Sequence, residues 1–163
     1  MNKNDLNAVF SHKSDNWITP QWLYDRLDLI YKFTLDPASD GLNNKCSKFY
    51  TPQDNGLDQS WKNETVYINP PYSNCYGWVK KAYLEARDNN VTSVLLLPAR
   101  MDTKWVHDFC FDKDICKSIT FIKGRLRFSD SKNSAPFPSM IIEMGQVVSG
   151  NQALLIRTMS NKK

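Results

Sequence analysis

The chain has 163 residues, with 21 basic and 17 acidic side chains and a formal net charge of +4. A chain of this length buries enough surface to fold without a metal or disulfide framework. We therefore expect a single domain over residues 1–163, in which the polar residues 1–16 form a flexible arm. The mild excess of positive charge does not by itself indicate a nucleic-acid-binding protein.

The cysteine and hydropathy patterns exclude several classes of protein. The four cysteines form no Cys-x-x-Cys pair and have only two histidines for company, so zinc-ligand spacing is absent and no metal site is expected. No run approaches the ~18 apolar residues of a membrane span, and the N-terminus lacks the apolar core of a secretory signal. We expect reduced thiols in a cytoplasmic protein without a membrane association, as a monomer or a weak homodimer.

The first predicted helix follows Trp17-Ile18-Thr19-Pro20. Thr19 is the expected N-cap and Pro20 the expected first helical residue. Apolar residues then recur with helical spacing at Leu23, Leu27, Ile30 and Tyr31. Trp17 and Ile18 form a hydrophobic staple on this helix, or Trp17 and the helix start line a cofactor pocket.

Two acidic residues follow the next two predicted strands. The strand over residues 33–36 ends at Asp36, and the small residues Ala38 and Ser39 come directly after it. Ligands approach the backbone at this point in nucleotide-binding folds, although the usual glycine fingerprint is missing here. The short strand over residues 48–51 is followed by Asp54, a candidate for the ribose hydroxyls or adenine of a cofactor. Ordinary turn chemistry is the alternative for both acidic residues.

The most informative stretch is Thr65-Val66-Tyr67-Ile68-Asn69-Pro70-Pro71-Tyr72-Ser73. Its β-branched and aromatic start predicts a buried strand, and the two prolines force the chain to leave the sheet as a rigid turn. Open α/β sheets bind ligands at the carboxyl ends of their strands. The turn therefore presents an amide, a proline carbonyl and a phenol ring at such an end.

These three groups suit a flat molecule that carries an amino group. The Asn69 side-chain oxygen and the Pro70 carbonyl can both accept hydrogen bonds from one planar –NH2 group, while the Tyr72 ring stacks on its plane. The lone pair of such an amine is delocalised into the ring, and two acceptors on its protons favour the pyramidal form that frees it. A proline-rich surface turn is the plainer alternative.

The second half of the chain continues the alternation of strands and helices. Helical spacing covers residues 78–89 and 103–109, and apolar strands are predicted at 93–97 and 119–122. Residues 124–128 read as a kinked strand or bulge, and residues 139–144 and 153–158 as a closing antiparallel pair. We expect a doubly wound, mostly parallel α/β sheet with an antiparallel C-terminal edge. Four basic residues of this half are candidates for phosphate or base contacts: Arg100, Lys104, Arg125 and Arg127.

The ordered set of motifs resembles a known family. Asn-Pro-Pro-Tyr at residues 69–72 resembles the catalytic motif of amino-methyltransferases that use S-adenosylmethionine. Trp-x-Thr-Pro, Leu-Asp-Pro-Ala-Ser, Asn-Pro-Pro-Tyr-Ser, Leu-Leu-Pro-Ala-Arg and Gly-Arg-Leu-x-Phe together resemble the small phage-type DNA N6-adenine methyltransferases. The resemblance runs from about Trp17 to Met144, which is most of the chain.

The resemblance implies a Rossmann-like S-adenosylmethionine-dependent methyltransferase fold, without a separate target-recognition domain. It implies S-adenosylmethionine as cofactor, adenine N6 in double-stranded DNA as acceptor and, for a phage or prophage protein, the bacterial host cytosol as compartment. By position it implies a catalytic turn of Asn69, Pro70, Pro71 and Tyr72. It likewise places Asp36 in the cofactor site, beside Trp17, Thr19, Pro20, Ala38 and Ser39.

Other functions remain open at this point. An RNA-base or protein glutamine-amide methyltransferase would share the fold and differ in its acceptor. A catalytically silent nucleic-acid-binding module would keep the fold without the reaction, although the intact Asn69 and Tyr72 argue against it. The sequence does not indicate which DNA site is recognised.

Overall fold

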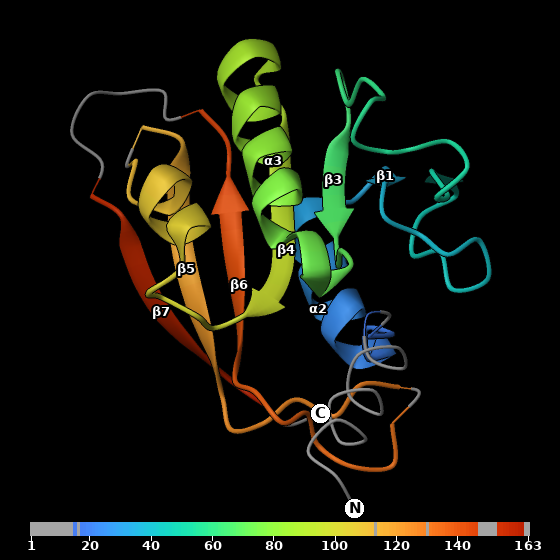
Figure 1. Cartoon of the computed structure of the whole chain (residues 1–163), viewed down its shortest axis with the longest axis vertical. Helices are drawn as coiled ribbons and strands as arrows, with labels where there is room; N and C mark the ends of the chain where they lie inside the picture. Colours follow the sequence, from blue (N-terminus) through green and yellow to red (C-terminus); the bar gives the residue numbers. More distant parts are fainter. Residues whose placement is uncertain (1–14, 16, 113, 130, 147–152, 162–163) are drawn as a thin grey trace, which may run out of the picture.

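The structure is a computed structural model that describes residue 15 and residues 17–112, 114–129, 131–146 and 153–161 (Figure 1). The strands are β1 (Leu35–Asp36), β2 (Lys48–Phe49), β3 (Thr65–Ile68), β4 (Thr92–Pro98), β5 (Cys116–Lys123), β6 (Ser139–Met144) and β7 (Leu155–Ser160). The helical segments are the α-helices α2 (Gln21–Tyr31) and α3 (Cys75–Asn89), the 3-10 turn η1 (Tyr72–Asn74) and the π-helical turn η2 (Val106–Cys110).

The strands form one sheet in the order β2-β1-β3-β4-β6-β5-β7. The pairs from β2 to β4 are parallel, β6 is antiparallel to both of its neighbours, and β7 is parallel to β5. The predicted class, a mostly parallel α/β sheet, is therefore confirmed. Because β1, β3, β4 and β5 all point the same way, the loops that follow them meet at one edge of the sheet.

The C-terminal strands differ from the expected arrangement in one respect. β6 and β7 do not pair with each other, because β5 lies between them. β6 is buried along nearly all of its length, whereas β7 is mostly exposed at the edge of the sheet. A continuous apolar run such as that of β6 is typical of a strand that is covered on both faces. Burial of this run favours an interior position for β6 in the sheet.

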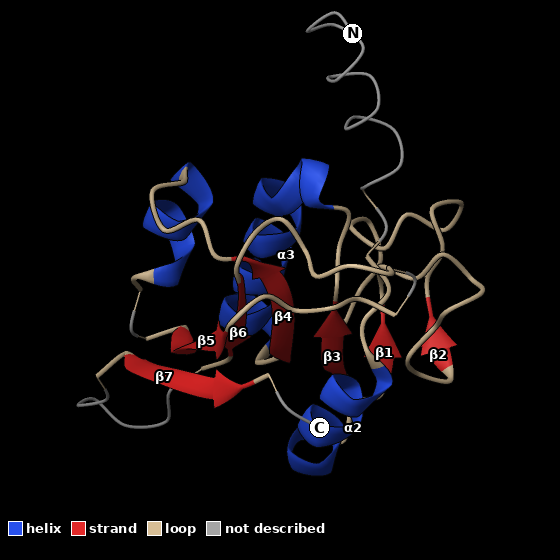
Figure 2. Ribbon diagram, turned by 90° about the horizontal axis from the view of Figure 1, so that it is seen from below, coloured by secondary structure: helices blue, strands red, loops and turns tan. Residues whose placement is uncertain are grey.

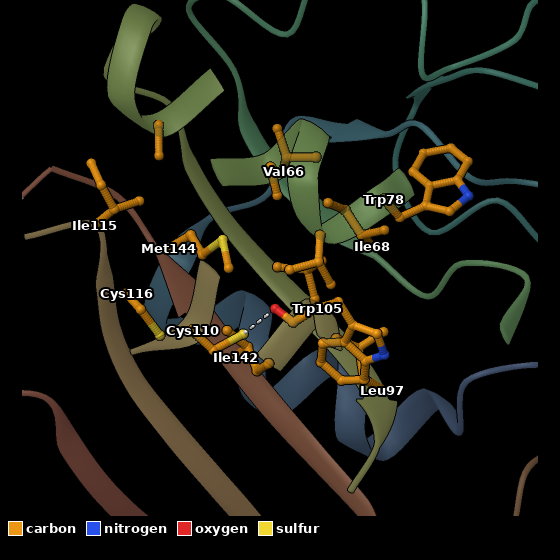
Figure 3. Close-up of a cluster of buried hydrophobic side chains, with 14 of the residues drawn as sticks. Val66, Ile68, Trp78, Leu97, Trp105, Cys110, Ile115, Cys116, Ile142 and Met144 are labelled. Carbon is orange, nitrogen blue, oxygen red and sulfur yellow. Dashed lines mark hydrogen bonds between the residues drawn. The ribbon is translucent and has the colours of Figure 1, made fainter. Parts of the chain in front are cut away.

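Helices cover both faces of the sheet, with α3 on one side and α2 on the other (Figure 2). Alternation along the strands divides the apolar side chains between two cores. On the α3 side, Val66 and Ile68 of β3 pack with Trp78 of α3 and Trp105 next to η2 (Figure 3). On the α2 side, Tyr67 packs among side chains of α2, β4 and the segment that follows β5. Adjacent residues of β3 therefore belong to different cores.

Three local expectations are wrong. The N-cap residue of α2 is Pro20, and the Thr19 side chain makes no capping hydrogen bond because its hydroxyl bonds to Tyr67 and Asn69 instead. Residues 125–128 form no strand or bulge after Gly124, since the carbonyls of Leu126 and Phe128 accept hydrogen bonds from their own loop. Ser129, the next residue, donates to the Ile18 carbonyl. Ile30, placed in the apolar stripe of α2, is 69% exposed.

Among the described residues, no helix combines the length and apolar character needed to cross a membrane. The same residues contain no cluster of three or more His, Cys, Asp or Glu side chains that could hold a metal ion.

Candidate active site

The turn that follows β3 stands at the sheet edge where the parallel strands end. Asn69 is the first residue beyond the strand, and the 3-10 turn η1 begins three residues later at Tyr72. The Pro71 carbonyl accepts a hydrogen bond from the Asn74 N–H, and Asn74 in turn caps α3 by accepting from Gly77. The turn is thus held between a buried strand and a capped helix, which makes it a rigid platform.

Hydrogen bonds to the segment before α2 fix the side chain of Asn69. Its Nδ2 donates to the Trp17 carbonyl and to Thr19 Oγ1, the latter at 2.9 Å. A carbonyl can only accept a hydrogen bond, so the amide must present its NH2 end to Trp17. Thr19 Oγ1 lies 2.7 Å from the Tyr67 hydroxyl, which is itself completely buried.

The opposite end of the Asn69 amide has no partner. Asn69 Oδ1 is buried and accepts no hydrogen bond, and the Tyr72 hydroxyl is buried in the same condition within the described structure. Leaving a buried polar atom unpaired costs about 1–3 kcal/mol. Two such atoms in one turn are therefore a sign that a ligand completes the site. Burial also raises the pKa of the Tyr72 phenol well above its ordinary value, so the ring stays uncharged at neutral pH.

An aromatic cluster surrounds Tyr72. The ring of Phe137 meets Tyr72 edge-on at 5.6 Å and Trp17 edge-on at 5.2 Å. Phe128 packs against both Trp17 and Phe137. The loop after β5 therefore supplies apolar side chains beside the Asn69–Tyr72 turn, a role that the sequence pattern did not indicate.

A pocket opens beside Asn69, between the segment before α2 and the loop after β1. It brings together seven of the eleven side chains predicted for the catalytic turn and cofactor site. The seven are Trp17, Thr19, Asp36, Ala38, Ser39, Asn69 and Pro71. Pro20, Pro70 and Tyr72 adjoin this lining in the chain without belonging to it, and Asp54 is elsewhere.

Asp36 supplies a carboxylate to the pocket from the end of β1. Its side chain is only 5% exposed and accepts hydrogen bonds from the backbone N–H groups of Lys45 at 2.9 Å and Ala38 at 3.3 Å. No lysine or arginine of the described chain forms a salt bridge with it. Burial raises the pKa of the Asp36 carboxyl to about 6, because the charged form loses solvation. A cationic ligand group would restore the missing counter-charge.

Asp54 does not lie in the pocket. Its carboxylate accepts hydrogen bonds from the backbone N–H and the hydroxyl of Thr51, both at 2.8 Å. This is the local turn chemistry that was the alternative for Asp54, so its expected place in a cofactor pocket is not found.

Several pocket residues were not expected from the sequence: Asp15, Ile18, Asp40, Asn43, Lys45 and Tyr67. Tyr67 could have been found, since residues two apart on a strand share a face and Tyr67 is two before Asn69. Asp40, Asn43 and Lys45 lie on the same loop as Asp36. Asp15, in the expected flexible arm, accepts hydrogen bonds from the backbone and hydroxyl of Ser73. The remainder of that arm lies outside the described residues.

The four predicted DNA contacts fall into two pairs. Arg100 follows β4, and its charge reaches Cys75 at the start of α3, where it partly offsets the burial that raises the pKa of this thiol to about 11. Lys104 pairs with Asp108 and lies over the Tyr76 ring. Arg125 and Arg127 line a broad groove with Trp22 of α2.

The sheet order, the single reversed strand β6 and the polar turn after β3 together define a protein of the Rossmann-like methyltransferase class. The chain belongs to the DNA N-6-adenine-methyltransferase (Dam) family, whose model matches residues 7–161. It is 36% identical over 121 residues to a DNA N-6-adenine-methyltransferase of Haemophilus phage HP1, an alignment that covers 72% of this chain and 68% of that protein.

A second relative is the DNA N-6-adenine-methyltransferase of Escherichia phage T1. It is 41% identical over 93 residues, which are 56% of this chain and 39% of the relative. The alignment therefore covers well under half of this longer relative.

Proposed function

We propose that this chain transfers a methyl group from S-adenosylmethionine to N6 of adenine in double-stranded DNA. The observation that carries the proposal is the Asn69 amide, whose NH2 end is anchored and whose Oδ1 has no partner. It stands beside a pocket that contains a buried carboxylate without a salt-bridge partner. Membership of the DNA N-6-adenine-methyltransferase family supports the same reaction.

The chemistry of the pocket fits S-adenosylmethionine, which carries a methyl-sulfonium group as the methyl donor. Asp36 would accept a hydrogen bond from its α-ammonium group, and this contact would place a positive charge beside a carboxylate that lacks one. Ala38 and Ser39 would leave room for the methionine moiety. Lys45 lines the same pocket and would face the carboxylate of the methionine moiety. Trp17 would close the side next to α2.

The catalytic turn would orient the acceptor. Asn69 Oδ1 and the Pro70 carbonyl would accept the two protons of the adenine amino group, and the Tyr72 ring would stack on the base, with Pro71 keeping the turn rigid. The target base must leave the duplex to reach them, at a cost of a few kcal/mol that stacking offsets. Orientation and charge placement are then the main catalytic effects. The proton released from N6 would pass to water.

Arg125, Arg127, Arg100 and Lys104 would contact the DNA. The loops that carry them follow β4 and β5, which end at the same sheet edge as the catalytic turn. Arg125 and Arg127 each donate one hydrogen bond to a backbone carbonyl of their own loop. The remaining guanidinium donors could reach phosphate oxygens.

The test is transfer of labelled methyl from S-adenosylmethionine to unmethylated duplex DNA, followed by digestion to nucleosides. We expect label in N6-methyldeoxyadenosine with the wild type and a loss of at least about 100-fold with Asn69→Ala, since the oriented acceptor is removed. Asn89→Ala is the control, because Asn89 is an exposed asparagine at the far end of α3 whose side-chain amide donates to Glu85.

Other acceptors would be visible in the same assay. Label in RNA or in a glutamine side chain, with none in DNA, would overturn the DNA assignment while leaving the methyltransferase reaction in place. Binding of S-adenosylmethionine with no transfer to any of the three acceptors would favour a silent nucleic-acid-binding module.

A further inference from the structure

The sequence places Thr19 as a helix cap and a neighbour of the cofactor, but its hydroxyl does something else. Thr19 is only 2% exposed, and its Oγ1 lies between Asn69 Nδ2 at 2.9 Å and the Tyr67 hydroxyl at 2.7 Å. The hydroxyl thus connects Tyr67, in the core on the α2 side of the sheet, to Asn69 in the turn after β3. Thr19 and Tyr67 also line the pocket beside Asn69.

The two ends of an asparagine amide have the same shape and opposite hydrogen-bonding character. A half-turn about the last side-chain bond would exchange Oδ1 for Nδ2. The amide would then present N–H groups to the amino group of adenine, which also donates, and the two donors would repel each other. The orientation of the Asn69 amide is therefore a requirement of the proposed reaction.

Three groups decide this orientation in the structure. The Trp17 carbonyl accepts one Nδ2 proton, and Thr19 Oγ1 accepts the other. Because a hydroxyl can rotate, Thr19 alone could offer its proton to the amide and stabilise the wrong orientation. The Tyr67 hydroxyl, which is buried and lies 2.7 Å from Thr19 Oγ1, removes that freedom when its oxygen accepts the Thr19 proton, because the Thr19 oxygen then only accepts from Asn69 Nδ2.

We propose that Thr19 is a positioning residue for catalysis, and that its hydroxyl, held by Tyr67, keeps the Asn69 amide with Oδ1 toward the target amino group. This inference rests on the proposed adenine methyltransferase function. It gives Thr19 a role in the rate of transfer and not in cofactor affinity. Tyr67 acts on the amide through Thr19.

The test compares Thr19→Val, Thr19→Ser and Tyr67→Phe. Valine has nearly the shape of threonine without the hydroxyl, and serine keeps the hydroxyl without the methyl group. With cofactor and DNA both saturating, we expect the single-turnover rate of Thr19→Val to fall by about 10- to 100-fold. Thr19→Ser should stay within about threefold of the wild type, and Tyr67→Phe should fall by about three- to tenfold. The dissociation constant for S-adenosylmethionine should change by less than about threefold in all three variants.

Two controls match these substitutions away from the site. Thr158→Val removes an exposed hydroxyl on the edge strand β7. Tyr83→Phe removes a phenol that donates to Asp112 at 2.6 Å from α3. Both should retain the wild-type rate, and unfolding midpoints for every variant separate a loss of rate from a loss of folded protein.

A second measurement follows the amide itself, without any need for activity. In ¹H–¹⁵N spectra, the side-chain NH2 signals of Asn69, assigned by their absence in Asn69→Ala, should shift in Thr19→Val and remain near their wild-type positions in Thr19→Ser. If the wild type transfers no methyl group to DNA, the proposed function is wrong, and these signals still report whether Thr19 holds the amide.

Three results would overturn the inference. Thr19→Val with a normal transfer rate and a weakened cofactor affinity would make Thr19 a cofactor contact, as its sequence position first indicated. Equal losses in Thr19→Val and Thr19→Ser would assign the effect to the methyl group and its packing. Unchanged Asn69 amide signals in Thr19→Val would show that the hydroxyl does not hold the amide.

Discussion

The buried carboxylate of Asp36 makes cofactor binding sensitive to pH at the scale of one residue. Burial raises its pKa from the ordinary 3.8 to about 6, so in the free protein the carboxyl takes up a proton as the pH falls through 6. A protonated carboxyl offers no negative charge to the α-ammonium group of S-adenosylmethionine. We therefore expect the cofactor affinity to fall by about tenfold between pH 7 and pH 5.

Calorimetric titration with S-adenosylmethionine across this range measures the effect. Asp36→Asn is the control, since its weaker binding should not vary with pH in the same way. A wild-type affinity that stays level from pH 7 to pH 5 would show that the charge of Asp36 does not contribute to binding.

The same residue predicts a conflict between stability and function. A carboxyl whose pKa is raised on folding favours the protonated form, so the free energy of unfolding falls as the pH rises from 3.8 to about 6 and is level above it. A pKa shift of this size means that the charged carboxylate costs the folded protein about 3 kcal/mol of stability. An uncharged asparagine avoids this cost, but its NH2 group would face a backbone N–H, which costs about 1–2 kcal/mol.

Asp36→Asn should therefore be about 1 kcal/mol more stable than the wild type at pH 8, and this gain should disappear near pH 4. Urea denaturation at both pH values is the measurement. A variant that is less stable than the wild type at pH 8 would mean that the hydrogen bonds from Lys45 and Ala38 outweigh the cost of burying the charge.

At the scale of elements, the sequence predicts the strands and α3 well because their patterns are periodic. The helical stripe through Trp78 and Val79 and the apolar run of β4 depend on burial, which the residues themselves encode. The sequence pattern predicts the start of α2 one residue too early. A threonine before a proline fits the capping pattern, but the Thr19 hydroxyl bonds instead to side chains of β3 and of the turn after it.

The residues of the candidate site also divide into those that the sequence pattern predicts and those that it does not. Asn69 and Asp36 were recognisable because each ends a predicted strand, and such ends meet at one sheet edge. Phe137 and Lys45 were not, because they reach the site from long loops whose course depends on tertiary contacts. Asp54 occupied an equivalent position after a strand, yet its carboxylate is used within its own turn.

The loop that carries Asp54 is held against Asp36 by a close backbone contact. A Cβ atom on Gly56 would meet the Pro37 carbonyl oxygen at 2.0 Å, a distance that only glycine avoids. The Gly56 carbonyl also accepts a hydrogen bond from the indole N–H of buried Trp61, so the turn cannot simply move aside. Strain here is transmitted to the end of β1, where Asp36 lies.

Gly56→Ala should therefore lower the free energy of unfolding by about 2–4 kcal/mol and weaken S-adenosylmethionine binding. Gly145→Ala is the matched control, because its Cβ would meet the far end of the flexible Lys117 side chain. Thermal unfolding and calorimetric titration measure the two effects. Equal stability in the two variants would show that the Gly56 turn tolerates displacement.

At the scale of the whole molecule, the topology gathers three surfaces at one edge of the sheet. The pocket with Asp36 follows β1, the proposed catalytic turn follows β3, and the groove with Arg125 and Arg127 follows β5. The segment from Trp17 to Trp22 connects them, since its first residues line the pocket and its last residues line the groove. DNA that enters the groove would therefore lie beside the catalytic turn.

This arrangement predicts how DNA affinity depends on salt. Each phosphate contact releases condensed counterions, so the slope of log affinity against log salt falls by about one for each arginine that binds a phosphate. Arg125→Ala and Arg127→Ala should each reduce the slope by about one and weaken binding to all sequences alike. Lys62→Ala is the control, because Lys62 is exposed and precedes β3, at the opposite edge of the sheet.

Fluorescence anisotropy with a labelled duplex between 50 and 200 mM salt, roughly the range over which such contacts are resolved, measures the slopes. A slope that changes as much for Lys62→Ala as for the arginines would place the DNA elsewhere on the molecule. A loss of affinity for one sequence alone, with the slope unchanged, would instead make the arginine a base contact in the major groove. In that case the groove beside α2 would contribute to reading the DNA sequence.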